Sequence, residues 1–195
     1  MRTFWTGLLI FWINFLSACS CDVLPYEPRC KQTMKWCCPS FGAYKVNTNA
    51  AIFSTQRRIG FGIIVRDHAG DAMGSSSQSL IACLSAQIAE AMAVLCGIIF
   101  TVETGLLPTV IESDSKSVVD LINSGKAPIA NVGIVIRNVF ELMNCYPVLV
   151  SFTGRSANCV AHGLAKLSIS LPEDRFWLET CPARVEDLVM ADRPV

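Results

Sequence analysis

Residues Ile59–Arg66 read Ile-Gly-Phe-Gly-Ile-Ile-Val-Arg, and the tetrapeptide Asp67-His68-Ala69-Gly70 follows them directly. The β-branched residues predict a buried strand, and the tetrapeptide has the composition of a tight turn. Tyr44–Ala50 alternates with a period of two before this strand, and Asp71–Gln78 can return after the turn as a further strand. The sequence therefore predicts an antiparallel meander of three strands.

The hydrophobic period changes after the meander. Ala86–Glu103 repeats apolar residues at the three-and-four spacing of an amphipathic helix, with an expected buried face of Ile88, Ala89, Met92, Leu95, Cys96, Ile99 and Phe100. The elements expected after this helix are a strand, two helices, a strand and a last helix, at Pro108–Ser113, Asp114–Ser124, Asn131–Asn144, Pro147–Thr153 and Ala157–Ser168. This order predicts an α/β fold with a five-stranded mixed sheet flanked by helices.

The overall composition sets limits on function. The chain has 195 residues, 52% of them hydrophobic and 16% charged, which is enough apolar material for one large core. Sixteen Lys and Arg balance sixteen Asp and Glu, so the broad positive field of a strongly basic nucleic-acid-binding protein is excluded. The apolar run Phe4–Leu16 is shorter than the roughly 18 residues of a membrane span. We therefore expect no membrane partner.

Residues 1–35 differ from the rest of the chain and are expected to form a leader. Arg2, an apolar stretch and the small residues 17–20 follow the order of a secretory signal, although an unstructured leader or a remnant of another domain fits as well. Five of the ten cysteines lie in the first 38 residues, and none has zinc-site spacing. Reduced thiols are expected rather than a disulfide framework. An intracellular protein, nuclear or cytoplasmic, is therefore expected over a secreted one.

Seven groups of residues occur in the order found in a known family: Trp36-x-x-Pro39, Lys45-Val46-Asn47-Thr48-Asn49-Ala50-Ala51, Gly60-Phe61-Gly62 with Val65-Arg66-Asp67-x-x-Gly70, Ala89-Glu90-Ala91, Glu112-Ser113-Asp114-Ser115, Arg155-x-x-Asn158-x-x-Ala161-His162-x-Leu164-Ala165-Lys166, and Trp177-Leu178-Glu179 with Pro182. Together they resemble the plant ribonuclease H-like domain of the reverse transcriptase-like family, which is related to non-LTR retrotransposons. The resemblance implies a ribonuclease H-like domain over residues 36–195, with a C-terminal extension from about residue 171.

The resemblance also implies a chemistry. Such domains hydrolyse the RNA strand of an RNA/DNA hybrid with two divalent metals, Mg²⁺ or Mn²⁺, held by carboxylates. Glu90 and Asp114 match the family's second and third carboxylates and are the expected metal ligands. Asn49 occupies the position of the first carboxylate, and His162 the position of the fourth. The predicted catalytic set is therefore Glu90, Asp114, His162 and a degenerate Asn49.

Each of these residues also has an ordinary structural interpretation. Glu90 fits a solvated helix flank, Asp114 fits a helix N-cap, and His162 fits a helix-surface histidine. Glu112 lies two residues before Asp114 and is the one nearby candidate to replace the missing charge. Asn49 keeps an oxygen ligand but adds no charge, so the two-metal site should be weakened and catalysis slow or absent.

The functional hypotheses differ in whether the chain cleaves nucleic acid. One is an RNA/DNA-hybrid endoribonuclease with a weakened metal site, and the other is a non-catalytic nucleic-acid-binding domain or a retroelement relic. Arg66, Arg155 and Asn158 are the expected nucleic-acid contacts. A secreted cysteine-bearing protein without nucleic-acid function is a third hypothesis, and the oligomeric state is left open.

Overall fold

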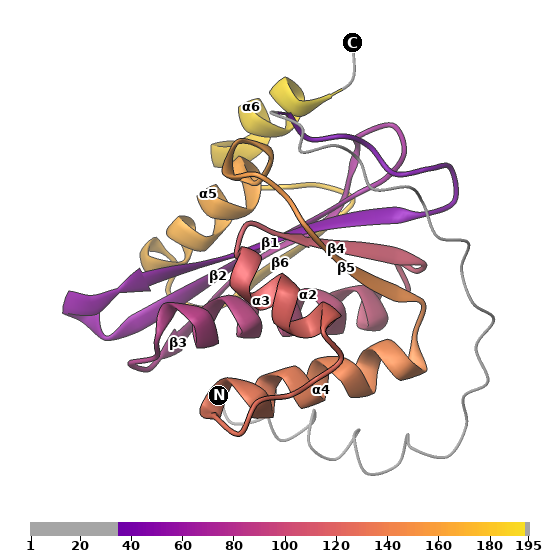
Figure 1. The fold of residues 1–195 in the computed structure, drawn as a ribbon. Coiled ribbons are helices and arrows are strands. Elements are labelled where there is room, and N and C mark those ends of the chain that lie inside the picture. The colour runs from indigo at the N-terminus through magenta and orange to yellow at the C-terminus, as the bar shows by residue number, and fades with distance from the viewer. Residues whose placement is uncertain (1–34, 194–195) are drawn as a thin grey trace.

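The computed structural model describes residues 35–193, in which a six-stranded mixed sheet forms the centre (Figure 1). Its order is β5-β4-β1-β2-β3-β6, with parallel β1–β4 and β4–β5 pairs and antiparallel β1–β2, β2–β3 and β3–β6 pairs. The strands are β1 (Tyr44–Phe53), β2 (Arg58–Arg66), β3 (Ala72–Ile81), β4 (Thr109–Ser113), β5 (Val148–Phe152) and β6 (Arg175–Leu178). The predicted α/β fold is confirmed, but the prediction of five strands missed β6. This strand has only four residues and lies at the sheet edge beside β3.

Helices cover both faces of the sheet, as Figure 1 shows. One layer contains α2 (Ala86–Thr104), α3 (Lys116–Asn123) and α4 (Asn131–Cys145). The opposite layer contains α5 (Cys159–Leu167), which packs on β1 and β2, and α6 (Ala183–Asp192), which packs on α5. Helix α6 was not predicted. It buries Val185 and Val189, one turn apart, in a core cluster with Ile64 and α5.

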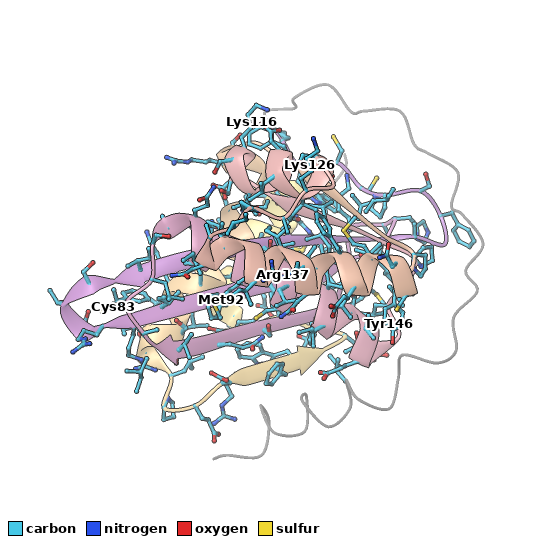
Figure 2. The ribbon with its side chains drawn as sticks, turned by 60° about the horizontal axis from the view of Figure 1, so that its bottom comes forward. Cys83, Met92, Lys116, Lys126, Arg137 and Tyr146 are labelled. Atoms are coloured by element: carbon cyan, nitrogen blue, oxygen red, sulfur yellow. The ribbon has the colours of Figure 1, made fainter. Side chains whose placement is uncertain are left out.

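The central helix α2 lies between the sheet and α4. It is the one helix of residues 35–193 that is long and apolar enough to cross a membrane by length and composition. Its packing in the core accounts for this composition. Figure 2 looks onto this layer and labels Met92 of α2 and Arg137 of α4.

The most deeply buried face of α2 matches the predicted one only in part, because Ala89 and Phe100 are buried as expected but other predicted residues are not. Its fully buried residues include Ala91, Val94 and Ile98, whereas Met92 and Leu95 of the predicted face are only partly buried. Small residues allow the helix to approach the sheet closely, because a Cβ at Gly97 would lie within 2.5 Å of Cγ2 of Thr48. The longer side chains pack instead around the flanks of the helix.

Two glycines of β2 determine how closely α5 approaches the sheet. A Cβ at Gly60 would collide with the carbonyl oxygen of Ala165, and one at Gly62 with the carbonyl oxygen of Ala161. Gly62 pairs with Asn49 across the β1–β2 ladder. The close approach therefore brings the backbone of α5 to the strand position that Asn49 occupies.

Arg66 joins both ends of the described chain. Its guanidinium is fully buried, donates to Asp192 Oδ2 at 2.8 Å and to Asn47 Oδ1 at 2.7 Å, and lies 3.7 Å from the centre of the Trp36 ring. The prediction that Arg66 contacts nucleic acid is therefore wrong, because the side chain has no exposed surface. It stabilises the fold by pairing the C-terminal helix with β1 and β2.

Asp192→Asn tests this contact. The substitution leaves a buried guanidinium without its counter-charge, so we expect the free energy of unfolding to fall by the order of 3 kcal/mol in urea denaturation. Asp120→Asn is the control, because it breaks the exposed Lys116–Asp120 pair and should cost no more than about 0.5 kcal/mol. Equal effects of the two substitutions would contradict the assigned role of Arg66.

The predicted leader, residues 1–35, lies outside the described residues except for Lys35. The predicted C-terminal extension from about residue 171 contains β6 and α6, and both pack on the rest of the domain. Within the described chain, Cys38, Cys83, Cys96, Cys159 and Cys181 carry free thiols.

Candidate active site

The register of β1 and β4 places Asn49 next to Asp114. These parallel strands pair Thr48 with Ser113, and each of the two site residues follows one of these partners directly. Asp114 lies after the last residue of β4 and before α3, whose N-cap is Ser115. Asp114 is therefore not the N-cap of this helix, and its carboxylate accepts hydrogen bonds from Asn49 of β1 and from Asn158 at the start of α5 instead.

The Asp114 carboxylate is surrounded by donors. Asn49 Nδ2 donates to its Oδ1 at 3.1 Å, and Asn158 Nδ2 donates to the same oxygen at 3.2 Å. The amide of Asn158 also donates to the carbonyl oxygen of Thr48 at 3.0 Å. Arg155 Nε lies 3.7 Å from Oδ2, and the Arg155 side chain is 94% exposed. The Asp114 carboxylate is therefore held by two amide donors and lies close to one guanidinium.

Asn158 is 1% exposed. The prediction that it contacts nucleic acid is wrong, because its Nδ2 group is committed to Thr48 and Asp114 inside the protein. It positions the start of α5 against the ends of β1 and β4. Of the three predicted nucleic-acid contacts, Arg155 alone is exposed beside the site.

His162 completes the group from α5. Its Nδ1 lies 3.1 Å from Asn49 Oδ1. Because Asn49 directs its donor nitrogen to the Asp114 carboxylate, its oxygen must face His162, and Nδ1 must therefore carry the proton. The pKa of His162 is lowered, first by partial desolvation and then by the nearby charge of Lys166, against the opposing effect of Asp114. The geometry and the pKa together indicate a neutral ring protonated on Nδ1.

Glu90 enters the site from the first turns of α2. Its Oε2 accepts a hydrogen bond from the backbone N–H of Ala50, at 3.3 Å. Burial, and to a smaller extent the nearby charge of Asp114, raise the pKa of Glu90 to about 8, while the Ala50 hydrogen bond and the charge of Arg155 act in the opposite direction. A substantial fraction of Glu90 is therefore protonated at neutral pH.

The raised pKa of Glu90 predicts a pH-dependent stability. Because the folded-state pKa of this acid exceeds its unfolded value, the free energy of unfolding should fall as the pH rises from about 4.5 to about 8. Glu90→Gln removes this ionisation, so its Tm relative to the native protein should rise across the same interval. Thermal unfolding at pH 5 and pH 8.5 measures the difference, with exposed Glu141→Gln as the control. A pH-independent difference would contradict the assigned burial of the Glu90 carboxyl.

The residues present do not fit a pair of divalent metals. Residues 35–193 contain no group of three His, Cys, Asp or Glu side chains that could hold a metal ion. Asp114 Oδ1 already accepts two amide hydrogen bonds, and Asn49 directs a nitrogen rather than an oxygen toward it. Glu112 does not replace the missing charge, because its carboxylate binds Lys45 Nζ at 3.2 Å and Asn47 Nδ2 at 2.9 Å.

The fold thus brings together four residues that the sequence singled out, namely Asn49, Glu90, Asp114 and His162, from β1, α2, the end of β4 and α5. It places Arg66 away from them, in the contact with Asp192. Sequence reasoning missed the positioning role of Asn158. Its place at the N-cap of α5, one turn before His162, was the available signal.

Comparison with solved structures identifies the fold. RNase H1 from the archaeon Halobacterium salinarum aligns with a TM-score of 0.60 and 14% identity over 66% of this chain and 98% of that chain. LC11-RNase H1, solved in complex with an RNA/DNA hybrid, aligns with a TM-score of 0.59 and 15% identity over 65% of this chain and 96% of that chain. The protein therefore has a ribonuclease H-like fold.

Sequence comparison identifies the family. The family model described as "Reverse transcriptase-like" matches residues 47–168, and the chain belongs to that family. A relative from Arabidopsis thaliana, named "Putative ribonuclease H protein", is 27% identical over 167 residues. The match covers 85% of this chain but only 27% of that relative, so the chain spans a small part of the length of the longer protein.

Proposed function

We propose that this domain binds RNA/DNA hybrid without cleaving it. The observation that carries the proposal is the hydrogen bond from Asn49 Nδ2 to Asp114 Oδ1, which places an N–H against one oxygen of the carboxylate that would have to bind a metal. The solved relative with a bound hybrid supports the choice of nucleic acid. A ribonuclease H-like surface can recognise such a duplex by the shape of its minor groove and its 2′-hydroxyl groups.

The charges of the site favour binding over hydrolysis. Two-metal hydrolysis requires anions that neutralise two dications and hold them a few ångströms apart. Here Asn49 is neutral, Glu90 is partly protonated, and Asp114 already interacts with two amides and Arg155. Such a site retains little negative charge, so it repels a phosphate less than a full set of carboxylates does.

The balanced net charge of the chain limits the affinity. Binding energy for nucleic acid comes largely from phosphate contacts by Lys and Arg, and each contact adds to the salt dependence. Arg155 provides one exposed contact next to the site. We therefore expect modest, salt-sensitive binding by this domain, which other parts of a longer protein can strengthen.

A weak endoribonuclease is the second candidate. The observation that favours it is that the carboxyl groups of Glu90 and Asp114 accept hydrogen bonds from two adjacent residues of β1, Ala50 and Asn49. Under this alternative, a high concentration of Mg²⁺ or Mn²⁺ would displace the amide hydrogen bonds and the Glu90 proton.

Cleavage of a labelled RNA/DNA hybrid by the full chain distinguishes these functions. With Mg²⁺ or Mn²⁺, we expect no cleavage by the native protein, cleavage by Asn49→Asp because it restores the missing carboxylate, and no cleavage once Glu90→Gln is added to it. Native cleavage that Glu90→Gln abolishes would establish the weak endoribonuclease. Absence of both binding and cleavage in every variant would refute both candidates.

Hybrid binding by Arg155→Ala tests the proposed contact separately. Loss of one phosphate contact should weaken binding at low salt and reduce the slope of log affinity against log salt by about one. Arg175→Ala is the matched control, because Arg175 lies on the edge strand β6, three strands away from β1. Equal losses in the two variants would show that Arg155 makes no specific contact.

A further inference from the structure

The side-chain amide of Asn49 connects three elements of the fold. Its nitrogen donates to Asp114 Oδ1 at the end of β4, and its oxygen accepts from His162 Nδ1 of α5, with both distances at 3.1 Å. Asn49 itself lies on β1 and is 4% exposed. A single neutral group therefore joins β1, β4 and α5 through directed hydrogen bonds.

The same arrangement occurs one step earlier on the same strands. Asn47 Nδ2 donates to Glu112 Oε2 at 2.9 Å, and Asn47 Oδ1 accepts from Arg66 Nη2 at 2.7 Å. Asn47 is fully buried and the register pairs it with Glu112. This second amide bridge adds to the backbone ladder between β1 and β4, so asparagine–carboxylate pairs connect these strands at two positions, two residues apart.

An aspartate at position 49 could not make this link. Its carboxylate would face Asp114 without a proton to donate, and two like charges at hydrogen-bond distance require a cation or a proton between them. The asparagine supplies an N–H in that place. It also keeps a proton on Nδ1 of His162, because its oxygen accepts a hydrogen bond from that atom.

We propose that the Asn49 amide replaces a divalent cation as the group that joins Asp114 to α5, so that the folded site is independent of metal. The amide and the Asn158 side chain satisfy Asp114 Oδ1 from two directions. These hydrogen bonds hold His162 and the start of α5 in place whether or not Mg²⁺ is available. This inference concerns the folded protein alone and stands even if the proposed binding of hybrid fails.

Thermal unfolding of the full chain in EDTA and in increasing Mg²⁺ at constant ionic strength tests the proposal. The native Tm should be the same in both, because the folded state has no site to be stabilised by the ion. The Tm of Asn49→Asp should be lower in EDTA and should rise with Mg²⁺ to a plateau, as ligand binding to a folded state requires. Asn47→Asp is the matched control. It makes the same change at a fully buried position of β1 and should show no Mg²⁺-dependent rise.

A native Tm that rises to a plateau with Mg²⁺, and loses that rise on Glu90→Gln, would overturn the proposal. So would an Asn49→Asp variant that folds equally well with and without the ion. If that variant is unfolded under both conditions, NMR of the native protein decides the question. Unchanged side-chain amide signals of Asn49 on addition of MgCl₂ support the proposal, and a saturable shift of these signals overturns it.

Discussion

The register of the parallel β1–β4 pair is the constraint on which the interior of this domain depends. It sets two asparagines of β1 beside two carboxylates, Asn47 beside Glu112 and Asn49 beside Asp114. Residues two apart on a strand share a face, so both pairs lie on the side that α5 covers. A slip of one residue would turn both amides away from this layer. The inner pair, Asn47 and Glu112, also contacts Arg66 through Asn47 and stabilises the fold. The outer pair, Asn49 and Asp114, forms the candidate site.

Close packing of α2 and α5 on the sheet brings two further site residues, Glu90 and His162, to this pair of strands. Gly62 allows α5 to rest on β2, directly across the ladder from Asn49, and Gly97 allows α2 to rest on β1 beside Thr48. The resulting approach is short enough for hydrogen bonds from α5 to reach the outer asparagine–carboxylate pair. Glycines outside the site therefore determine where His162 and Glu90 lie, because they let the two helices pack closely on the sheet.

The candidate site is polar but poor in charge. Glu90 is partly protonated at neutral pH, His162 is neutral, and the carboxylate of Asp114 is satisfied by two amides and a nearby guanidinium. Buried charge is costly when unpaired, and this arrangement reduces that cost without a bound ion. The same property that makes the site stable in the folded chain removes the anions that two-metal hydrolysis needs. Stability and the proposed loss of catalysis therefore have one physical origin.

The sequence by itself determined the order of the main strands and helices, because period-two and three-and-four hydrophobic patterns are local properties. Order along the chain also singled out Asn49, Glu90, Asp114 and His162, which the structure brings together. Only the tertiary structure decided the burial of Arg66, whose partner Asp192 lies 126 residues away. It also decided which face of α2 is buried, since apolar residues surround that helix, and added the short elements β6 and α6. Such features depend on contacts between distant segments, which no local pattern records.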